Sequence, residues 1–293
     1  MKYNIITCAC AAFIIGMAAS CSQDEAVETT LDPRTTPMTF DVSYPGGGAK
    51  KTRVADDSFE QGDKVGLFVA AADAPLEIGG NLVNNEALTC EGDKWTAGKT
   101  LYWDNGVFNA YAYYPYMPTV SSVTDLPFNV AEDQRGDGYE KSDFLYARTE
   151  NVSASASPVQ LQFRHIMSKL TVRLIKGEDF EGEMPTDAVL RIHNTVPSST
   201  IDLSVGMATR DVKGTRSTII AHQDGDYIYS AIIVPQRIAN RQPLVEVEMK
   251  GVSYLLESTF VFKPGTEHLV NLVITDNPEQ AKIEIGGEIQ NWE

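Results

Sequence analysis

The stretch that decides the fold is Val159–Leu174, with the sequence VQLQFRHIMSKLTVRL. Apolar side chains occupy the odd positions of its first part, Val159–Phe163, and the even positions of its last part, Leu170–Leu174. Alternation with a period of two is typical of a half-buried strand. A regular strand cannot move its apolar set by one residue without turning its core face to water. The stretch therefore predicts a core strand with a bulge or break near Arg164–Lys169, where it changes sheet or direction.

Similar short strands are predicted along the rest of the chain, and no segment has convincing helical periodicity. Alternating or apolar runs, separated by turn residues, cover Val65–Ala70, Thr100–Trp103, Val107–Tyr114, Val189–His193, Ser217–Ala221, Tyr227–Val234, Leu244–Met249, Tyr254–Phe262, Leu269–Ile274 and Lys282–Ile285. Regular short strands without helices favour a sandwich or barrel over a βαβ fold. We therefore predict an all-β protein of two tandem β-sandwich domains, divided at the small, polar stretch Asn151–Ser157.

The N-terminus has the pattern of an export signal. Met1–Ser20 carries one positive charge, Lys2, followed by the apolar run Ile5–Ala19. This segment is too short and wrongly flanked for a membrane-spanning helix, and it is typical of a secretory signal peptide. Small residues directly before Cys21 indicate a bacterial lipoprotein signal, with Cys21 as the lipidated first residue of the mature protein. Ordinary cleavage near Cys21, with the thiol incidental, is the alternative.

Cysteine usage and charge limit the possible chemistry and partners. Cys8 and Cys10 would leave with the signal peptide and Cys21 would carry lipid, so Cys90 would remain alone and no internal disulfide framework is possible. We expect Cys90 to be a small buried apolar residue, because no His lies near it in the sequence. The formal net charge of −16 counts against nucleic acid and anionic membrane surfaces as partners, because both attract basic patches.

Five short motifs, in order along the chain, resemble those of a known family. They are FEQGDKVGLF at Phe59–Phe68, AYAYYPY at Ala110–Tyr116, DFLYA at Asp143–Ala147, FRHIMSKL at Phe163–Leu170 and IQNW at Ile289–Trp292. Together they resemble the fimbrillin-like family of Bacteroidetes, the type V pilins and their relatives. The resemblance implies transthyretin-like β-sandwich domains in an exported, lipidated pilus subunit or pilus-associated adhesin. Such a protein would be located at the outer membrane surface or in the fimbrium.

The same resemblance implies assembly by strand exchange. An Arg-specific protease would remove an N-terminal strand, and a C-terminal strand of another subunit would fill the apolar groove and pair with its free N–H and C=O groups. In this chain the removed strand would be Met38–Val42, and cleavage after Arg53 would leave Val54 as the new N-terminus. The donor segment would be Lys282–Trp292. The residues expected to point into the partner's groove are Ile283, Ile285, Ile289 and Trp292.

The C-terminal segment has a second interpretation, in which it is the last edge strand of its own domain. The expected organisation is a signal peptide at 1–20, a tether and pro-segment at 21–53, an N-terminal sandwich at 54–155 and a C-terminal sandwich with the candidate donor strand at 156–293. The expected partners are other pilin subunits, the outer membrane through the lipid, and a ligand on a host or bacterial surface.

Motifs for catalysis, cofactors and metals are weak. Gly98-Lys99-Thr100 ends like a P-loop, but Gly92 is one residue too distant and no helix pattern follows. The four histidines have no metal-ligand spacing, and there is no G-x-S-x-G elbow. His165, within the fold-deciding stretch, is expected to be a hydrogen-bonded structural residue. We therefore expect no enzyme activity, no cofactor and no metal.

One tripeptide, Arg135-Gly136-Asp137, has two interpretations. In the first it is an integrin-type adhesion loop, because an exposed Arg and Asp on a tight turn supply both charges. In the second it is a solvated turn, since tripeptides recur by chance. The loop's carboxylates at Asp133, Asp137 and Asp143 do not have the spacing of an EF-hand.

A function of a different class is also considered, that of a surface lipoprotein which binds glycans and never polymerises. Its aromatic side chains, among them Trp95, Trp103 and Tyr116, would then form an exposed stacking platform. A pilin should bury most of these rings, so their solvent exposure separates the two functions.

Overall fold

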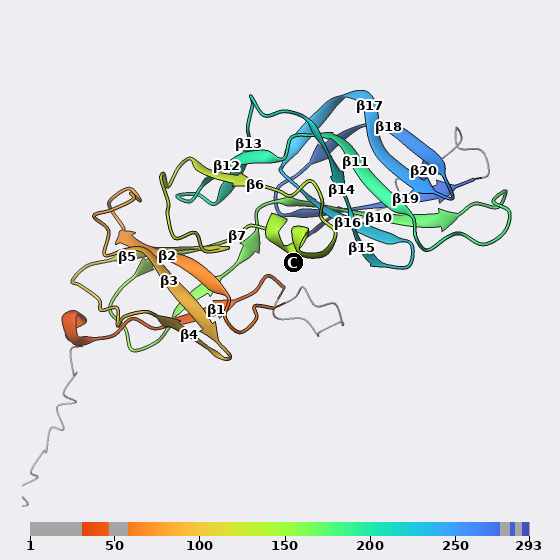
Figure 1. Ribbon diagram of the computed structural model, residues 1–293. Coiled ribbons are helices and arrows are strands. Elements are labelled where there is room, and N and C mark those ends of the chain that lie inside the picture. Colours follow the sequence, from red (N-terminus) through yellow and green to blue (C-terminus); the bar gives the residue numbers. More distant parts are fainter. Residues whose placement is uncertain (1–30, 47–57, 276–281, 285–288, 293) are drawn as a thin grey trace, which may run out of the picture. The chain divides into compact units, whose positions relative to one another are not determined.

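The strands are described in two groups. The first group forms a six-stranded sheet and a two-stranded sheet (Figure 1). The computed structural model describes residues 31–46, 58–275, 282–284 and 289–292. The larger sheet has the order β4-β3-β2-β5-β7-β9, with bounds Lys94–Ala97, Val83–Glu91, Lys64–Ala71, Phe108–Tyr114, Leu145–Val152 and Arg164–His165. The smaller sheet pairs β1 (Phe40–Ser43) in parallel with β8 (Val159–Gln162).

The second group contains three sheets. One has the order β15-β16-β10-β19-β20, with β21 also on β19, and bounds His222–Gly225, Ile228–Ile233, Ser168–Lys176, Thr266–Ile274, Lys282–Glu284 and, for β21, Ile289–Asn291. The next has the order β14-β11-β17-β18, with bounds Ser217–Ile220, Val189–Thr195, Gln236–Met249 and Val252–Phe262. The third has the order β13-β12-β6, with bounds Met207–Arg210, Ser198–Asp202 and Leu126–Asn129.

Helices are almost absent from the described residues. They are three short 3-10 helices, η1 (Pro33–Thr35), η2 (Gly136–Gly138) and η3 (Glu140–Ser142). Within the described ranges, none of them is long and apolar enough to cross a membrane. The all-β fold class predicted from the strand pattern is confirmed.

Buried apolar side chains form two clusters, which we call the first core and the second core. Strand β2 contributes to both, because its odd-numbered residues, such as Val65 and Leu67, lie in the first core and its even-numbered residues Phe68 and Ala70 lie in the second. A strand that is buried on both faces needs apolar residues at consecutive positions. This explains why β2 reads as a nearly continuous apolar run instead of an alternating one.

The fold-deciding stretch passes from the first core to the second. Val159, Leu161 and Phe163 belong to the first core, whereas the even-numbered residues from Leu170 to Leu174 belong to the second. Regular pairing stops after β9, which lies on β7, and resumes at β10, which lies between β16 and β19. The two residues between the strands, Ile166 and Met167, are fully buried. The predicted break and change of sheet are therefore confirmed.

The expected domain boundary at 155/156 lies between β7 and β8. Residues on both sides of it, such as Leu145 and Leu161, contribute to the first core. After Phe163 the chain contributes no further residue to the first core, and Ile166 and Met167 belong to the second. The described residues from Leu31 onward form one compact unit. The division into two sandwiches stays a prediction, and the passage between the cores lies about ten residues later than 155/156.

Candidate functional site

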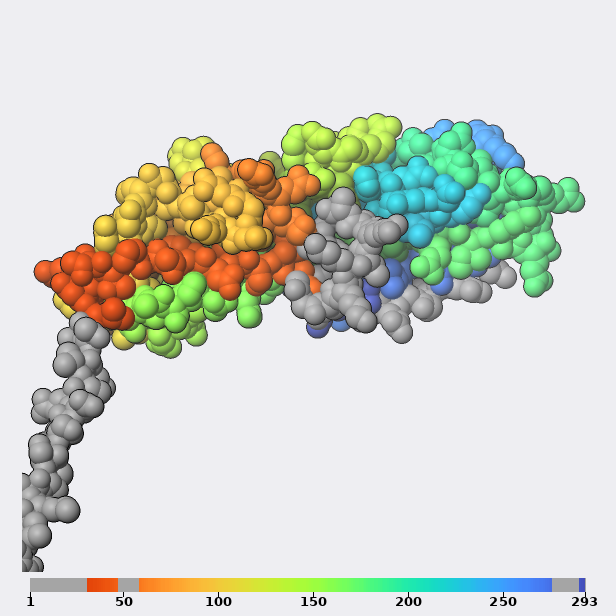
Figure 2. Space-filling model, turned by 90° about the horizontal axis from the view of Figure 1, so that it is seen from below, coloured from red at the N-terminus to blue at the C-terminus, as the bar shows by residue number. Residues whose placement is uncertain are grey.

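Residues 36–43, which we call the N-terminal segment, lie between two other parts of the chain, residues 101–103 and strand β8. On one side, the Met38 N–H donates to the Leu101 carbonyl at 2.8 Å. The Trp103 N–H donates to the Thr36 carbonyl at 3.3 Å on the same side. On the other side, β1 pairs with β8. The segment is thus hydrogen-bonded on one side through residues 36–38 and on the other side through residues 39–43. It lies at the surface, in orange-red, in Figure 2.

Apolar side chains also hold the N-terminal segment in place. Met38 is only 7% exposed and belongs to the first core, against which Phe40 and Val42 also pack. Burial of a Met side chain contributes about 1.5–3 kcal/mol, and each backbone hydrogen bond contributes about 1 kcal/mol net. Removal of the segment would expose part of the first core. It would also free the N–H groups of Trp103 and Val159, the latter of which donates to the Thr39 carbonyl at 2.9 Å.

His165 lies where the N-terminal and C-terminal parts of the chain meet. It is 3% exposed, and its Nδ1 lies 2.9 Å from Oδ2 of Asp143. Its ring stacks on the Trp292 indole, with centroids 3.8 Å apart and planes 3° from parallel. Tyr44, just after β1, meets it edge-on at 5.9 Å. His165 is thus a hydrogen-bonded structural residue, as the sequence predicted.

The C-terminal strands β20 and β21 both pair antiparallel with β19 of the same chain. Ile283 lies opposite Leu272, and Ile289 lies opposite His268. The Trp292 N–H donates to the Gly265 carbonyl at 3.1 Å. Both strands therefore lie at the edge of their own sheet in the isolated chain, and their role as a donor stays a prediction.

Glu267 connects β19 to the C-terminal residues. Its Oε2 accepts a hydrogen bond from Gln290 at 2.8 Å, and its Oε1 accepts one from Thr171 at 2.8 Å. Lys169 Nζ lies 3.5 Å from Oε1. Burial opposes ionisation of this carboxyl, but the positive charge of Lys169 and the hydrogen bonds outweigh it and lower the pKa of Glu267.

The tripeptide Arg135–Asp137 lies at the start of η2 and is exposed, but both of its charges have partners. The Arg135 guanidinium contacts both carboxylate oxygens of Asp133, at 2.8 and 2.6 Å. Its hydrogen bonds to Asp133 lower the pKa of that carboxyl to about 2. The Asp137 Oδ2 accepts a hydrogen bond from Lys141 at 3.2 Å. Gly136 has φ +60°, a backbone conformation that favours glycine. The adhesion interpretation stays a prediction.

The sequence analysis missed Gln134, which fixes this loop to the second group of strands. Its side chain is fully buried. Its Nε2 donates to the Ile232 carbonyl at 2.7 Å, and its Oε1 accepts from the Ile232 N–H at 2.8 Å. The Gln134 amide thus bonds both backbone groups of Ile232, as the backbone of a neighbouring strand would. No signal in the local pattern distinguishes this Gln from the polar residues around it.

The aromatic residues do not form an exposed platform. Trp103 is 3% exposed. Trp95 is half-buried and meets Phe59 edge-on, with ring centroids 5.1 Å apart, and Tyr116 is half-buried as well. The three rings proposed for glycan stacking are therefore covered to a large extent, which argues against the glycan-binding alternative.

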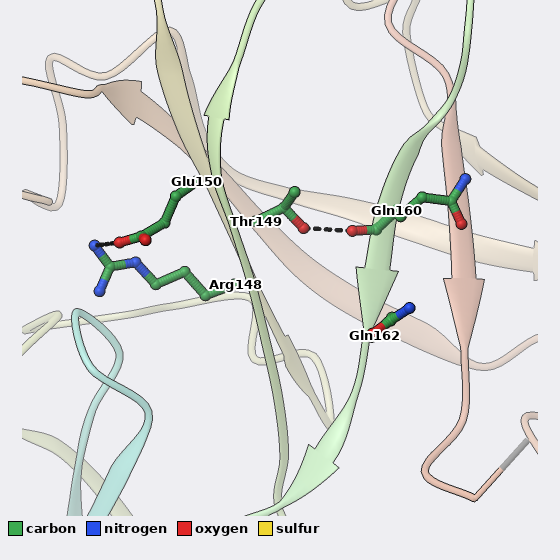
Figure 3. Close-up of a pocket in the computed structure, with 5 residues that line it drawn as sticks. All are labelled: Arg148, Thr149, Glu150, Gln160 and Gln162. Carbon is green, nitrogen blue, oxygen red and sulfur yellow. Dashed lines mark hydrogen bonds and ion pairs between the residues drawn. The ribbon is translucent and has the colours of Figure 1, made fainter.

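A shallow polar pocket lies between β7 and β8 (Figure 3). The strands diverge there, and the Thr149 hydroxyl donates to the Gln160 carbonyl across the gap. Arg148 and Glu150 form an ion pair at 2.6 Å on the β7 side. Gln162 completes the lining. The polar groups of Arg148, Thr149 and Glu150 thus have partners within the chain, and the pocket presents no group prepared for catalysis.

Metal-binding and thiol chemistry have little support in the described part of the chain. No group of three or more His, Cys, Asp or Glu side chains there could hold a metal ion. Cys90 is 4% exposed, and burial raises the pKa of its thiol. A buried thiol with a raised pKa is a poor nucleophile.

Several predicted site residues lie outside the described residues. They are the lipidation site Cys21, the cleavage site Arg53–Val54 and the donor residue Ile285.

Comparison with known proteins adds to this geometry. A family model described as fimbrillin-like matches residues 52–292. The chain belongs to the fimbrillin-like family. Membership implies a fimbrial, cell-surface location for this fimbrillin-like protein and confirms the resemblance found in the five motifs.

Individual relatives agree with this family. A Bacteroides uniformis protein named Fim1C, described as a proposed fimbrium subunit, is 24% identical over all of this chain and 96% of its own length. Two solved structures, both named as proposed cell adhesion proteins, share 19% identity with this chain and cover 88% of it. The one from Bacteroides uniformis has a TM-score of 0.68 over 98% of its length, and the one from Bacteroides ovatus 0.70 over 97%. These structures show the same fold.

Proposed function

We propose that this fimbrillin-like protein is an exported lipoprotein that serves as a pilus subunit or pilus-associated adhesin and assembles by protease-triggered strand exchange. The observation that carries the proposal is the two-sided pairing of the N-terminal segment, residues 36–43. A strand that is hydrogen-bonded along both edges leaves a groove when it is removed, with apolar walls and unpaired backbone groups. An added strand from another subunit can satisfy both.

Cleavage would take place after Arg53. This residue ends the basic stretch Lys50–Arg53, which follows the Gly-rich sequence Pro45–Gly48. A cut there separates the whole N-terminal segment from the rest of the chain. Arg34 is a poorer site, because Pro33 precedes it and a cut after it would keep the segment attached.

The replacement strand would come from the C-terminus of a neighbouring subunit. Residues 282–285 alternate charge with isoleucine, two glycines follow, and residues 288–292 alternate again. Isoleucines at every second position would point into the first core of the acceptor, in place of Met38 and its neighbours. In the donor, β20 and β21 would first leave the edge of β19. They are three residues long each, so few backbone hydrogen bonds oppose their release.

The anchor would be a lipid on Cys21. Acyl chains inserted in the outer membrane hold a protein far better than a bare tether does. Cys21→Ser should leave an unlipidated precursor, and mass spectrometry of the mature N-terminus measures this. An unmodified mature N-terminus at another residue would exclude the anchor. A structural role in a filament needs no catalytic group, and none is assigned.

The experiment that tests assembly is N-terminal sequencing of purified filaments, with Arg53→Ala as the test variant and Arg34→Ala as its matched control. We expect filament subunits to begin at Val54, Arg53→Ala to stay monomeric, and Arg34→Ala to polymerise normally. Filaments whose subunits begin at Cys21, or normal polymerisation of Arg53→Ala, would contradict the proposal.

A further inference from the structure

Strand β18 is an unusually long exposed sheet edge. It spans the 11 residues Val252–Phe262 and pairs with β17 on one side only. No other described strand pairs with its outer edge. The other strands at sheet edges in the described ranges span two to four residues. A long free edge is a ready template for pairing with another chain.

This edge lacks two of the usual features that prevent such pairing, proline and basic residues, although its ladder with β17 contains two register shifts. Between residues 252 and 262 there is no proline, lysine or arginine. The only charge is Glu257, which lies 3.7 Å from Arg241. Val252, Leu255 and Val261 are 37%, 47% and 47% exposed. An apolar edge without prolines or basic residues favours association.

Residues 254–262 of β18 are matched about Ser258. Three of the four pairs at equal distances have similar character: Leu256 and Phe260, Leu255 and Val261, Tyr254 and Phe262. In the fourth pair Glu257 is matched with the uncharged Thr259. A two-fold symmetric contact requires this kind of match, because each surface meets its own copy. Burial follows the same symmetry, since Leu255 and Val261 are equally exposed and Tyr254 and Phe262 are both buried.

We propose that two copies of this chain associate through antiparallel pairing of β18 with β18, with the two-fold axis at Ser258. Exposed Leu255 of each copy then lies opposite exposed Val261 of the other, on one face of a continuous sheet. Glu257 faces Thr259, whereas an axis at Glu257 would place two carboxylates opposite each other. Charge and apolar matching therefore select the same register.

This pairing goes beyond the proposed strand exchange and is independent of it. It uses neither the N-terminal segment nor β20 and β21. Two four-stranded β14-β11-β17-β18 sheets would join into one sheet across the axis. The occupant of the edge is a second copy of the same chain, and the contact connects subunits side by side.

The first test is cross-linking of the uncleaved full chain with Ser258→Cys. Directly opposed residues in an antiparallel pair have Cα atoms about 4.5–5.5 Å apart, which a disulfide spans. The matched control is Ser253→Cys on the same strand, since its two copies would be ten positions, on the order of 33 Å, apart. The unsubstituted chain gives the background. We expect oxidation to produce a covalent dimer with Ser258→Cys at least tenfold above both controls. Equal yields for the two variants would overturn the register, and no dimer above background with Ser258→Cys would overturn the pairing.

The second test does not depend on disulfide geometry. Sedimentation of the full chain at increasing concentration measures the dimer fraction. Leu255→Lys with Val261→Lys should raise the dimer dissociation constant at least tenfold, because like charges would be added along the edge of both copies. Val212→Lys, at a residue that is 80% exposed outside the strands, should leave it unchanged. A monomer at all concentrations, or equal effects of the two changes, would overturn the proposal.

Discussion

The imidazole of His165 stacks on the indole of Trp292, with ring centroids 3.8 Å apart and planes 3° from parallel. His165 ends the part of the chain that belongs to the first group of strands, and Trp292 is the last residue that the structure describes. Lys169 Nζ lies 5.9 Å from the centroid of the same indole. One aromatic contact therefore fixes the C-terminus beside the point where the chain passes between its two cores.

Replacement of Trp292 by Ala should lower the stability of the monomer. Aromatic pairs contribute about 0.5–1.5 kcal/mol beyond the area that they bury. Part of the burial energy of the indole is lost as well, so we expect a total loss of about 1–3 kcal/mol. For a chain of this size, each kcal/mol lowers Tm by roughly 2–4 °C. Circular dichroism measures the shift. Gln290→Ala, on the exposed side of β21, is the control and should change Tm less. An unchanged Tm for Trp292→Ala would mean that the stack does not hold the C-terminus.

Gln134→Ala should be destabilising although the residue lies in a polar loop. The change leaves the buried N–H and C=O of Ile232 without their side-chain partner. An unsatisfied buried polar group costs about 1–3 kcal/mol. We expect a loss of about 2–5 kcal/mol in the free energy of unfolding, measured by urea denaturation. Gln223→Ala removes a comparable hydrogen bond, to the Thr186 carbonyl, at an exposed site and should cost less than about 1 kcal/mol.

Glu267 should make part of the stability depend on pH. Its pKa in the folded protein lies below the ordinary value of 4.5, so the unfolded chain binds the proton more readily. The stabilising contribution is therefore complete above about pH 4.5 and is lost as the pH falls through the lowered pKa. We expect Tm to fall between neutral pH and this acidic range more steeply for the unsubstituted chain than for Glu267→Gln. Equal slopes for the two chains would contradict the assigned role of Lys169 and the hydrogen bonds.

Adhesion through Arg135–Asp137 can be tested by Asp137→Glu, since integrin-type recognition tolerates little change in reach. We expect binding to integrin-bearing cells to be unchanged, because both charged side chains are already paired, with Asp133 and Lys141. Stability should change by no more than about 0.5 kcal/mol, as is usual at an exposed site. Loss of cell binding with an unchanged Tm would instead support the adhesion loop.

The sequence was most informative where burial has a strict period. The shift of apolar residues from odd to even positions in Val159–Leu174 predicted the passage between two sheets, because each arm has a single buried face. Strand β3 (Val83–Glu91) was not predicted. Asn85, with φ +46°, interrupts its alternation, and the hydrogen-bond partners of its side chain, the Tyr113 hydroxyl and the Met117 carbonyl, are far away in the sequence.

The candidate site was only partly predictable for a related reason. His165 was placed correctly as a structural residue because it lies within a strand pattern. Its stacking on Trp292 joins residues that are far apart in the sequence, and no local pattern reports such a contact. The predicted strand Thr100–Trp103 is irregular apart from a single bridge between Tyr102 and Pro37. The alternation of Thr100–Trp103 reflects its hydrogen bonds to the N-terminal segment, because this stretch is not a strand of any sheet.

The donor role of the C-terminal segment is tested by Ile283→Asp with Ile285→Asp. Alternation places these isoleucines on the side opposite Lys282 and Glu284, so they would enter the acceptor's groove. Burial of each isoleucine contributes about 1.5–3 kcal/mol, so the pair is worth about two to four orders of magnitude in subunit affinity. We expect electron microscopy to show no filaments of the double variant. The matched control, Lys282→Ala with Glu284→Ala, changes the other side of the strand and should still polymerise.

The stability of the monomer decides between the two interpretations of this segment. If it is a donor, the double variant should unfold within a few degrees of the unsubstituted chain, because β20 contributes only three residues to the edge of β19. If its main role is to close its own sheet, the isoleucines are part of the monomer's core. Their replacement should then lower Tm by roughly 6–24 °C, from a loss of about 3–6 kcal/mol. A chain truncated after Asn277 provides the decisive comparison. Filaments from that chain, or a loss of Tm well beyond that of Trp292→Ala, would refute the donor assignment.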